Sequence, residues 1–169
     1  MKAFRSIKPT DKFTWHLQDD VLLSSKFRKK TTIDYSLPVV CGFSNVYSKD
    51  RPAGIVLPNN IWYSSQCIYI HPLICEEFVK WIDEYAINQK RYAKMFELGI
   101  CDDQLFEEYL NIKAPSVKIL NVAPNFVEHI DYLLGGSIVN PDAKANRRSI
   151  HWIEPELTQK LENKLQERK

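Results

Sequence analysis

A short apolar run that passes directly into an amphipathic helix is the feature that most restricts the fold of this 169-residue chain. The run is Ser65–Ile70, and His71-Pro72 follows it, with proline in the first helical turn that it favours. Apolar residues then recur at helical spacing, so that one helix face can pack on a sheet. These residues are Ile74, Phe78, Trp81, Ile82 and Tyr85. A strand followed at once by such a helix predicts an α/β fold.

Further segments of both kinds continue this pattern along the chain. The predicted strands are Phe13–Leu17, Pro38–Phe43, Ser65–Ile70, Val117–Val122 and the short extended segment Phe126–Ile130. The predicted helices are Leu22–Lys30 and the segments that begin at Pro72, Asp102 and Pro155. The stretch Ser44–Asn60 is polar and contains several turn residues, which predicts a long loop. We therefore expect an α/β fold with a mixed, mostly parallel sheet flanked by helices.

The end of the chain is predicted to form a helix that follows this domain. We assign residues 1–153 to the domain and residues 154–169 to a C-terminal amphipathic helix. Leu157, Leu161 and Leu165 recur four residues apart there, with charged residues between them. Such a stripe packs on a core or pairs with another helix.

Composition and charge exclude several classes of protein. The formal net charge of +2 is too small to indicate nucleic-acid binding, and no apolar run approaches the length of a membrane span. The N-terminal residues lack the apolar region of a secretory signal. The four cysteines show no C-x-x-C spacing, which favours buried free thiols over a zinc or redox motif. We therefore expect a protein of the reducing cytoplasm.

Two adjacent carboxylates, Asp19 and Asp20, follow the first predicted strand directly. Open α/β sheets bind ligands at the carboxyl ends of their strands. Two carboxylates fixed at such a position can hold a hard divalent cation, which in turn can hold a diphosphate. Aspartate is also a good N-cap, so capping of a following helix explains the same pair without any function.

Three further polar groups stand at predicted helix starts, in an extended segment or on a loop. Asp102 and Asp103 open a helix, and His129 lies in the extended segment. The third group is a basic cluster on a predicted loop, formed by Lys144, Arg147 and Arg148. At one edge of a sheet, these groups and the first acidic pair would supply a manganese or magnesium site, a general base and cations for a diphosphate. Capping and surface solvation are the structural alternatives for the aspartates and the basic cluster.

The same motifs resemble those of a known enzyme family. The sequence WHLQDDV at 15–21 is similar to the strand-end acidic motif of GT-A fold glycosyltransferases, where Gln-Asp-Asp-Val is one variant of Asp-x-Asp. The sequence CDDQLF at 101–106 resembles the motif that opens the helix carrying the catalytic base in inverting members. The sequence PNFVEHI at 124–130 resembles the segment whose histidine completes the metal shell. The glycines and serine at 135–137 and the arginines before Ser149 resemble the tail of small bacterial and phage members.

The resemblance implies metal-dependent transfer of a sugar from a nucleotide sugar to an acceptor hydroxyl, with a role for each motif residue. Asp20 and His129 would bind Mn²⁺ or Mg²⁺, and Asp19 would face the donor ribose or a metal-bound water. Asp103 would be the general base, with Asp102 beside it. The residues that would contact the diphosphate are Lys144, Arg147 and Arg148.

Two departures from the family pattern qualify these implications. Gln18 occupies the first position of the acidic triplet and is not an acid, which removes one candidate metal ligand. Family members usually begin with a β-α-β-α-β unit that binds the nucleotide base, whereas the first strand predicted here already carries the acidic motif. We therefore expect an N-terminally truncated relative, in which Met1–Ile7 is the end of the last helix of that unit.

Two alternative functions fit the same sequence. A catalytically inactive remnant of a transferase would bind a sugar or a partner, and an uncovered sheet edge would allow it to form a homodimer. A metal-dependent phosphoester hydrolase would use the same acids, but the sequence lacks the dense cluster of histidines and aspartates that favours this function.

Overall fold

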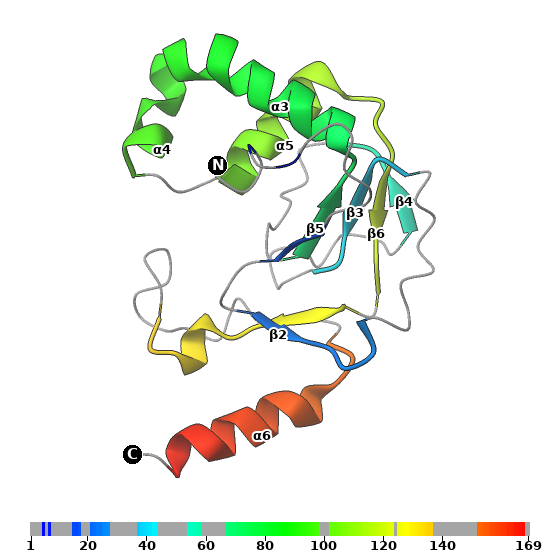
Figure 1. Cartoon of the computed structure of the whole chain (residues 1–169), viewed down its shortest axis with the longest axis vertical. Helices are drawn as coiled ribbons and strands as arrows, with labels where there is room; N and C mark the ends of the chain where they lie inside the picture. Colours follow the sequence, from blue (N-terminus) through cyan, green and yellow to red (C-terminus); the bar gives the residue numbers. More distant parts are fainter. Residues whose placement is uncertain are drawn as a thin grey trace.

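The computed structural model of the chain describes residues 5, 7, 15–17, 21–27, 37–43, 54–58, 67–98, 102–123, 125–136 and 152–167. A five-stranded sheet lies at the centre of the fold (Figure 1). Helices α3 (Pro72–Glu84) and α5 (Asp102–Lys113) cover one face. A two-stranded sheet covers the other, with helix α6 (Pro155–Gln166) outside it. The predicted α/β fold, with a mixed sheet flanked by helices, is confirmed.

The larger sheet contains both parallel and antiparallel neighbours. Its strands, in spatial order, are β1 (Trp15–Leu17), β5 (Cys67–Ile70), β3 (Val39–Cys41), β6 (Ile119–Asn121) and β4 (Gly54–Val56). Among the described residues β3 and β6 are parallel, and the other three pairings are antiparallel. The prediction of a mostly parallel sheet is therefore wrong. An apolar run predicts a buried strand, but its direction depends on the path of the connecting segments.

The face of the sheet toward α3 and α5 holds the larger hydrophobic core. Side chains alternate along each strand, so Val39 and Cys41 of β3 face these helices together with Ile68 and Ile70 of β5. The helices contribute buried aromatic and aliphatic side chains, namely Phe78, Trp81, Ile82, Leu105, Phe106, Tyr109 and Leu110. The face of α3 predicted from apolar spacing thus contributes to this core, except for Tyr85, which is 40% exposed at the end of the helix.

Helix α3 begins as the sequence predicts. Pro72 is its first residue, and the Nδ1 atom of His71 accepts a hydrogen bond from the backbone N–H of Leu73 at 3.3 Å. Short helical segments then lead toward α5, namely η2 (Ala86–Asn88), η3 (Lys90–Tyr92) and α4 (Ala93–Leu98). Near the N-terminus, the guanidinium group of Arg5 donates two hydrogen bonds to Asp83 of α3, at 2.8 and 2.5 Å.

The opposite face of the large sheet is covered by a second, antiparallel sheet. It consists of β2 (Val21–Leu23) and β7 (Val127–His129). The core between the two sheets contains Val40, Phe43, Cys67, Tyr69, Phe126 and Val127. The predicted extended segment around Val127 is confirmed, but the predicted helix at Leu22–Lys30 is wrong at its start. Val21–Leu23 is an apolar run that pairs with β7, which lies far away in the sequence.

A second correction concerns the long loop predicted at Ser44–Asn60. Within it, Gly54–Val56 forms β4, which pairs with β6 at the edge of the large sheet. Gly54 has φ of 108°, a left-handed conformation that glycine adopts without strain. Three residues are too few to show an alternating pattern, and the surrounding prolines and asparagines favour a loop.

The cysteines of the described residues belong to the core. Cys41, Cys67 and Cys75 are free and buried, as the sequence predicts, and Cys101 lies outside the described residues. Burial raises the pKa of Cys75 to about 11 and also raises the pKa of Cys67. These thiols therefore stay protonated at neutral pH and serve as packing groups. None of the described helices has the length and apolar character that crossing a membrane requires.

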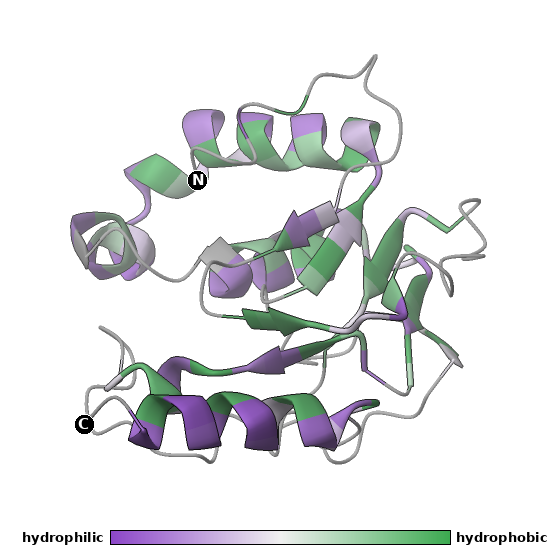
Figure 2. Cartoon of the chain, turned by 60° about the horizontal axis from the view of Figure 1, so that its bottom comes forward, coloured by the Kyte–Doolittle hydropathy of each residue, from purple (hydrophilic) through white to green (hydrophobic). Residues whose placement is uncertain are grey.

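Helix α6 packs beneath the two-stranded sheet. Figure 2 shows its apolar side turned toward β2 and β7 and its polar side turned away. The buried carboxylate of Glu154, directly before the helix, accepts hydrogen bonds from Ser24 Oγ at 2.8 Å and from the backbone N–H of Ser25 at 2.7 Å. It also accepts one from Ser25 Oγ at 2.5 Å. Glu154 thus connects the start of α6 to the turn that follows β2.

We expect the stabilising effect of Glu154 to depend on pH. The hydrogen bonds from Ser25 and Ser24 lower the pKa of Glu154. Its ionised form therefore stabilises the fold above the unfolded-state pKa of about 4.3, and this contribution disappears as the pH falls through the lower folded-state pKa. Urea unfolding should show a larger deficit for Glu154→Gln at pH 7 than at pH 3. Glu156→Gln, which changes an exposed carboxylate of α6, is the matched control. Equal deficits of Glu154→Gln at the two pH values would contradict the prediction.

Candidate functional site

The carboxyl ends of the parallel strands β3 and β6 define one edge of the large sheet. Just beyond them the backbone N–H of Val122 donates to the carbonyl of Cys41 at 2.9 Å. The N–H of Phe126 donates to the carbonyl of Gly42, also at 2.9 Å, so the segment that leads into β7 crosses this edge. A Cβ atom at Gly42 would lie 2.7 Å from Cys67 Sγ, so only glycine fits this crossing without displacement. Ligands of α/β sheets bind outside such strand ends.

The pairing of β2 with β7 brings two of the sequence motifs together. Val21, the residue directly after Asp20, lies opposite His129. Residues directly opposite each other in an antiparallel pair share one face, so the side chains of Val21 and His129 lie on the same face of this sheet. Asp19 and Asp20 themselves lie outside the described residues. The register therefore places the chain that follows the acidic motif beside the histidine of the third motif.

His129 is enclosed by protein. Its side chain is 1% exposed, and its Nδ1 atom lies 3.3 Å from Oδ1 of Asp131, whose side chain is equally buried. The ring of Phe43 meets the imidazole edge to face, with 6.2 Å between the ring centroids. The backbone N–H of His129 donates to Oε1 of Glu128 at 3.0 Å. The imidazole thus lies against a carboxylate on its Nδ1 side and against an aromatic ring.

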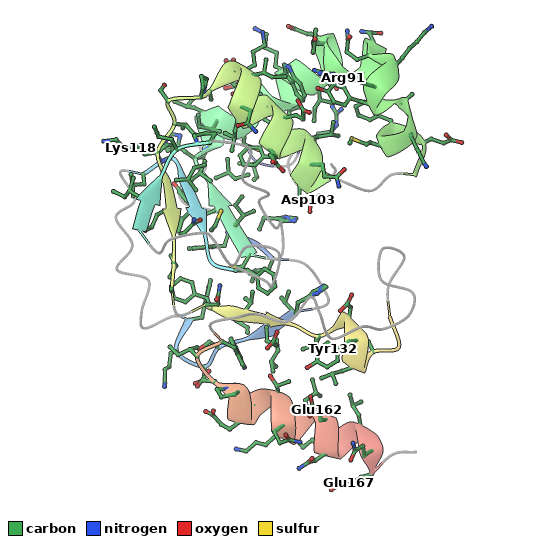
Figure 3. The ribbon with its side chains drawn as sticks, turned by 180° about the vertical axis from the view of Figure 1, so that it is seen from behind. Arg91, Asp103, Lys118, Tyr132, Glu162 and Glu167 are labelled. Carbon is green, nitrogen blue, oxygen red and sulfur yellow. The ribbon has the colours of Figure 1, made fainter. Side chains whose placement is uncertain are left out.

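Asp103 stands in the first turn of α5. Its side chain is partly exposed, and its Oδ1 accepts a hydrogen bond from the backbone N–H of Gln104 at 2.9 Å. Because α5 leads into β6, the start of the helix lies toward the same edge as the carboxyl end of that strand. Figure 3 shows Asp103 at the end of α5 that is turned toward the two-stranded sheet. Asp102 is the first residue of the helix, and its side chain is outside the described residues.

The remaining predicted site residues, Lys144, Arg147 and Arg148, also lie outside the described part of the chain. Within the described ranges no group of three or more histidine, cysteine, aspartate or glutamate side chains is arranged to hold a metal ion. Sequence reasoning missed Asp131, the neighbour of His129. His129 and Asp131 are two residues apart in the sequence, but a His-x-Asp spacing is too common to indicate a site by itself.

Comparisons of the chain with protein-family models, curated proteins and solved structures find no match. The described geometry offers a buried imidazole and carboxylate, a carboxylate at a helix start, and a strand register that fixes the chain next to Asp20.

Proposed function

We propose that the protein is a metal-dependent glycosyltransferase, which moves a sugar from a nucleotide-sugar donor to an acceptor hydroxyl. The observation that carries this proposal is the register of β2 and β7, in which Val21 lies opposite His129. The segment that directly follows the acidic motif and the strand that carries the histidine, more than 100 residues apart in sequence, are thereby neighbours. The resemblance of these motifs to those of GT-A enzymes supports the same function.

The proposed metal ligands suit manganese. An imidazole nitrogen from His129 and a carboxylate oxygen from Asp20 would form a mixed set, and imidazole shifts the preference from magnesium toward manganese. His129 Nδ1 lies 3.3 Å from Oδ1 of Asp131, and metal-binding histidines commonly have a carboxylate beside one ring nitrogen. A bound divalent cation would stabilise the negative charge that develops on the leaving diphosphate.

The remaining residues would act on the acceptor and the donor. The acceptor oxygen attacks the anomeric carbon, and the bond from that carbon to the diphosphate oxygen breaks. The hydroxyl proton passes to the carboxylate of Asp103, whose position at a helix start leaves it partly exposed to a substrate. Lys144, Arg147 and Arg148 would balance the charge of the departing nucleoside diphosphate. The sugar is thus transferred to the acceptor oxygen, the proton to Asp103, and the diphosphate departs with the nucleoside.

The test is turnover of a panel of nucleotide sugars with Mn²⁺ and with EDTA. We expect release of nucleoside diphosphate, and formation of a glycosylated acceptor, only with the metal present. Asp20→Ala should weaken Mn²⁺ binding by at least about tenfold. Glu76→Ala, which removes an exposed carboxylate from α3, is the control and should bind Mn²⁺ as the unmodified protein does. Lack of Mn²⁺ binding and of turnover with every donor would contradict the proposal and favour a non-catalytic remnant.

A further inference from the structure

We infer that helix α6 is a releasable strap, which opens as a unit from the outer face of the two-stranded sheet while the rest of the fold stays intact, and that the carboxylate of Glu154 holds it closed. The inference concerns a movement of the fold and does not depend on the proposed function. It rests on one juxtaposition: a helix with little buried surface of its own follows directly on a carboxylate that is bound to the turn after β2.

Both oxygens of the Glu154 carboxylate accept hydrogen bonds from this turn. Oε2 accepts from Ser24 Oγ at 2.8 Å and from the backbone N–H of Ser25 at 2.7 Å, and Oε1 accepts from Ser25 Oγ at 2.5 Å. The turn is itself fixed, since the N–H of Ser24 donates to the carbonyl of Phe126 at 3.0 Å. Hydrogen bonds to a charged group are stronger than neutral ones. One side chain therefore holds the start of α6 in place.

The face that α6 turns toward the sheet contributes much less. Of the 12 residues of the helix only Thr158 is fully buried, and its hydroxyl has no hydrogen-bond partner. Such a group opposes docking, because it gives up its hydrogen bonds to water and gains none in return. The leucine stripe of the helix is only partly buried, at Leu157, Leu161 and Leu165. Among the described residues, neither hydrophobic core includes a side chain of α6.

A second contact lies further along the helix. The hydroxyl of Tyr132, in the short helix η4 (Asp131–Leu133) after β7, donates to Oε1 of Glu162 at 3.3 Å (Figure 3). This hydrogen bond is long and only partly buried, so it is weaker than those to Glu154. The strap thus extends from the turn after β2 to the segment after β7, with its stronger attachment at its first end.

Opening would expose the outer face of the two-stranded sheet. Val21 and Val127 face the inner core, so their neighbours Leu22 and Glu128, which lie opposite each other, project from the outer face. Helix α6 lies on that face (Figure 2). Glu128 is 1% exposed while α6 is docked, so we expect release of the strap to bring this carboxylate into water.

The first experiment is native-state hydrogen exchange of the unmodified full chain at pH 7. We expect the amides of α6 to be at least about tenfold less protected than those of α3. The amide of Ser25, which is bound to Glu154, should share the protection of α6. Equal protection of α6 and α3 would overturn the inference. This measurement needs no variant, so it stays decisive if a variant does not fold.

The second experiment repeats the exchange measurement on variants that act on opposite sides of the balance. Glu154→Gln removes the charge that holds the strap and should speed exchange of α6 by about tenfold or more. Thr158→Val removes the unpartnered hydroxyl at similar volume and should slow it by at least about fivefold. Glu156→Gln changes an exposed carboxylate of α6 and should leave the rate unchanged. Exchange of α6 that neither Glu154→Gln nor Thr158→Val alters would overturn the inference.

Discussion

Under the proposed function, replacing Asp103 by asparagine is expected to lower kcat for sugar transfer by about 10²–10⁴-fold, the usual effect of losing a general base. Asparagine preserves the size of the side chain and can still accept the hydrogen bond from the Gln104 backbone N–H through its carbonyl oxygen. It cannot take a proton from the acceptor hydroxyl. The loss should therefore appear in the chemical step, while Mn²⁺ affinity and the melting temperature stay close to those of the unmodified protein.

Asp102 provides the comparison for this experiment. It is the neighbouring carboxylate in the same helical turn, and sequence reasoning placed it beside the base without a separate role. Steady-state kinetics on Asp102→Asn should show a much smaller loss of kcat than Asp103→Asn. The reverse order would assign proton transfer to Asp102. Unchanged kcat in both variants would show that the start of α5 does not supply the base.

The sequence predicts the segments of this fold better than their arrangement. Helix α3 and strands β3 and β5 could be recognised because each has either helical apolar spacing or a continuous apolar run. The direction of β5 relative to β3 could not, since it depends on how residues far apart in sequence pair. Val21–Leu23 shows the same limit. Its three apolar residues fit a helix or a strand equally well, and pairing with β7 decides between them.

The candidate site divides in a similar way. His129 and Asp103 could be selected from the sequence because each belongs to a longer motif that resembles a family pattern. Asp131 could not, because its relation to His129 arises from the turn after β7 rather than from a recognisable motif. The meeting of the Val21 segment with His129 is likewise a property of tertiary structure, since it depends on strand register.

The largest effect on stability is expected from Phe78, at the centre of the core between α3, α5 and the sheet. Its side chain is fully buried, and it packs against the aromatic rings of both helices. The centroid of its ring lies 5.0 Å from that of Phe106 and 5.5 Å from that of Tyr109, both on α5. Trp81, one turn further along α3, stacks at 6.4 Å. Phe78 therefore links the helix that carries Asp103 to the rest of the core.

Phe78→Ala should lower the free energy of unfolding by about 3–5 kcal/mol, because it removes this buried ring and leaves a cavity that rigid neighbours cannot close. Urea titration followed by circular dichroism measures the change. Leu73→Ala is the control on the same helix: its side chain is 54% exposed, so we expect a change within about 0.5 kcal/mol. Similar losses for the two variants would mean that α3 does not pack on α5 through Phe78. Since α5 belongs to this core, Phe78→Ala should also reduce the proposed transfer activity at temperatures where the unmodified protein stays folded.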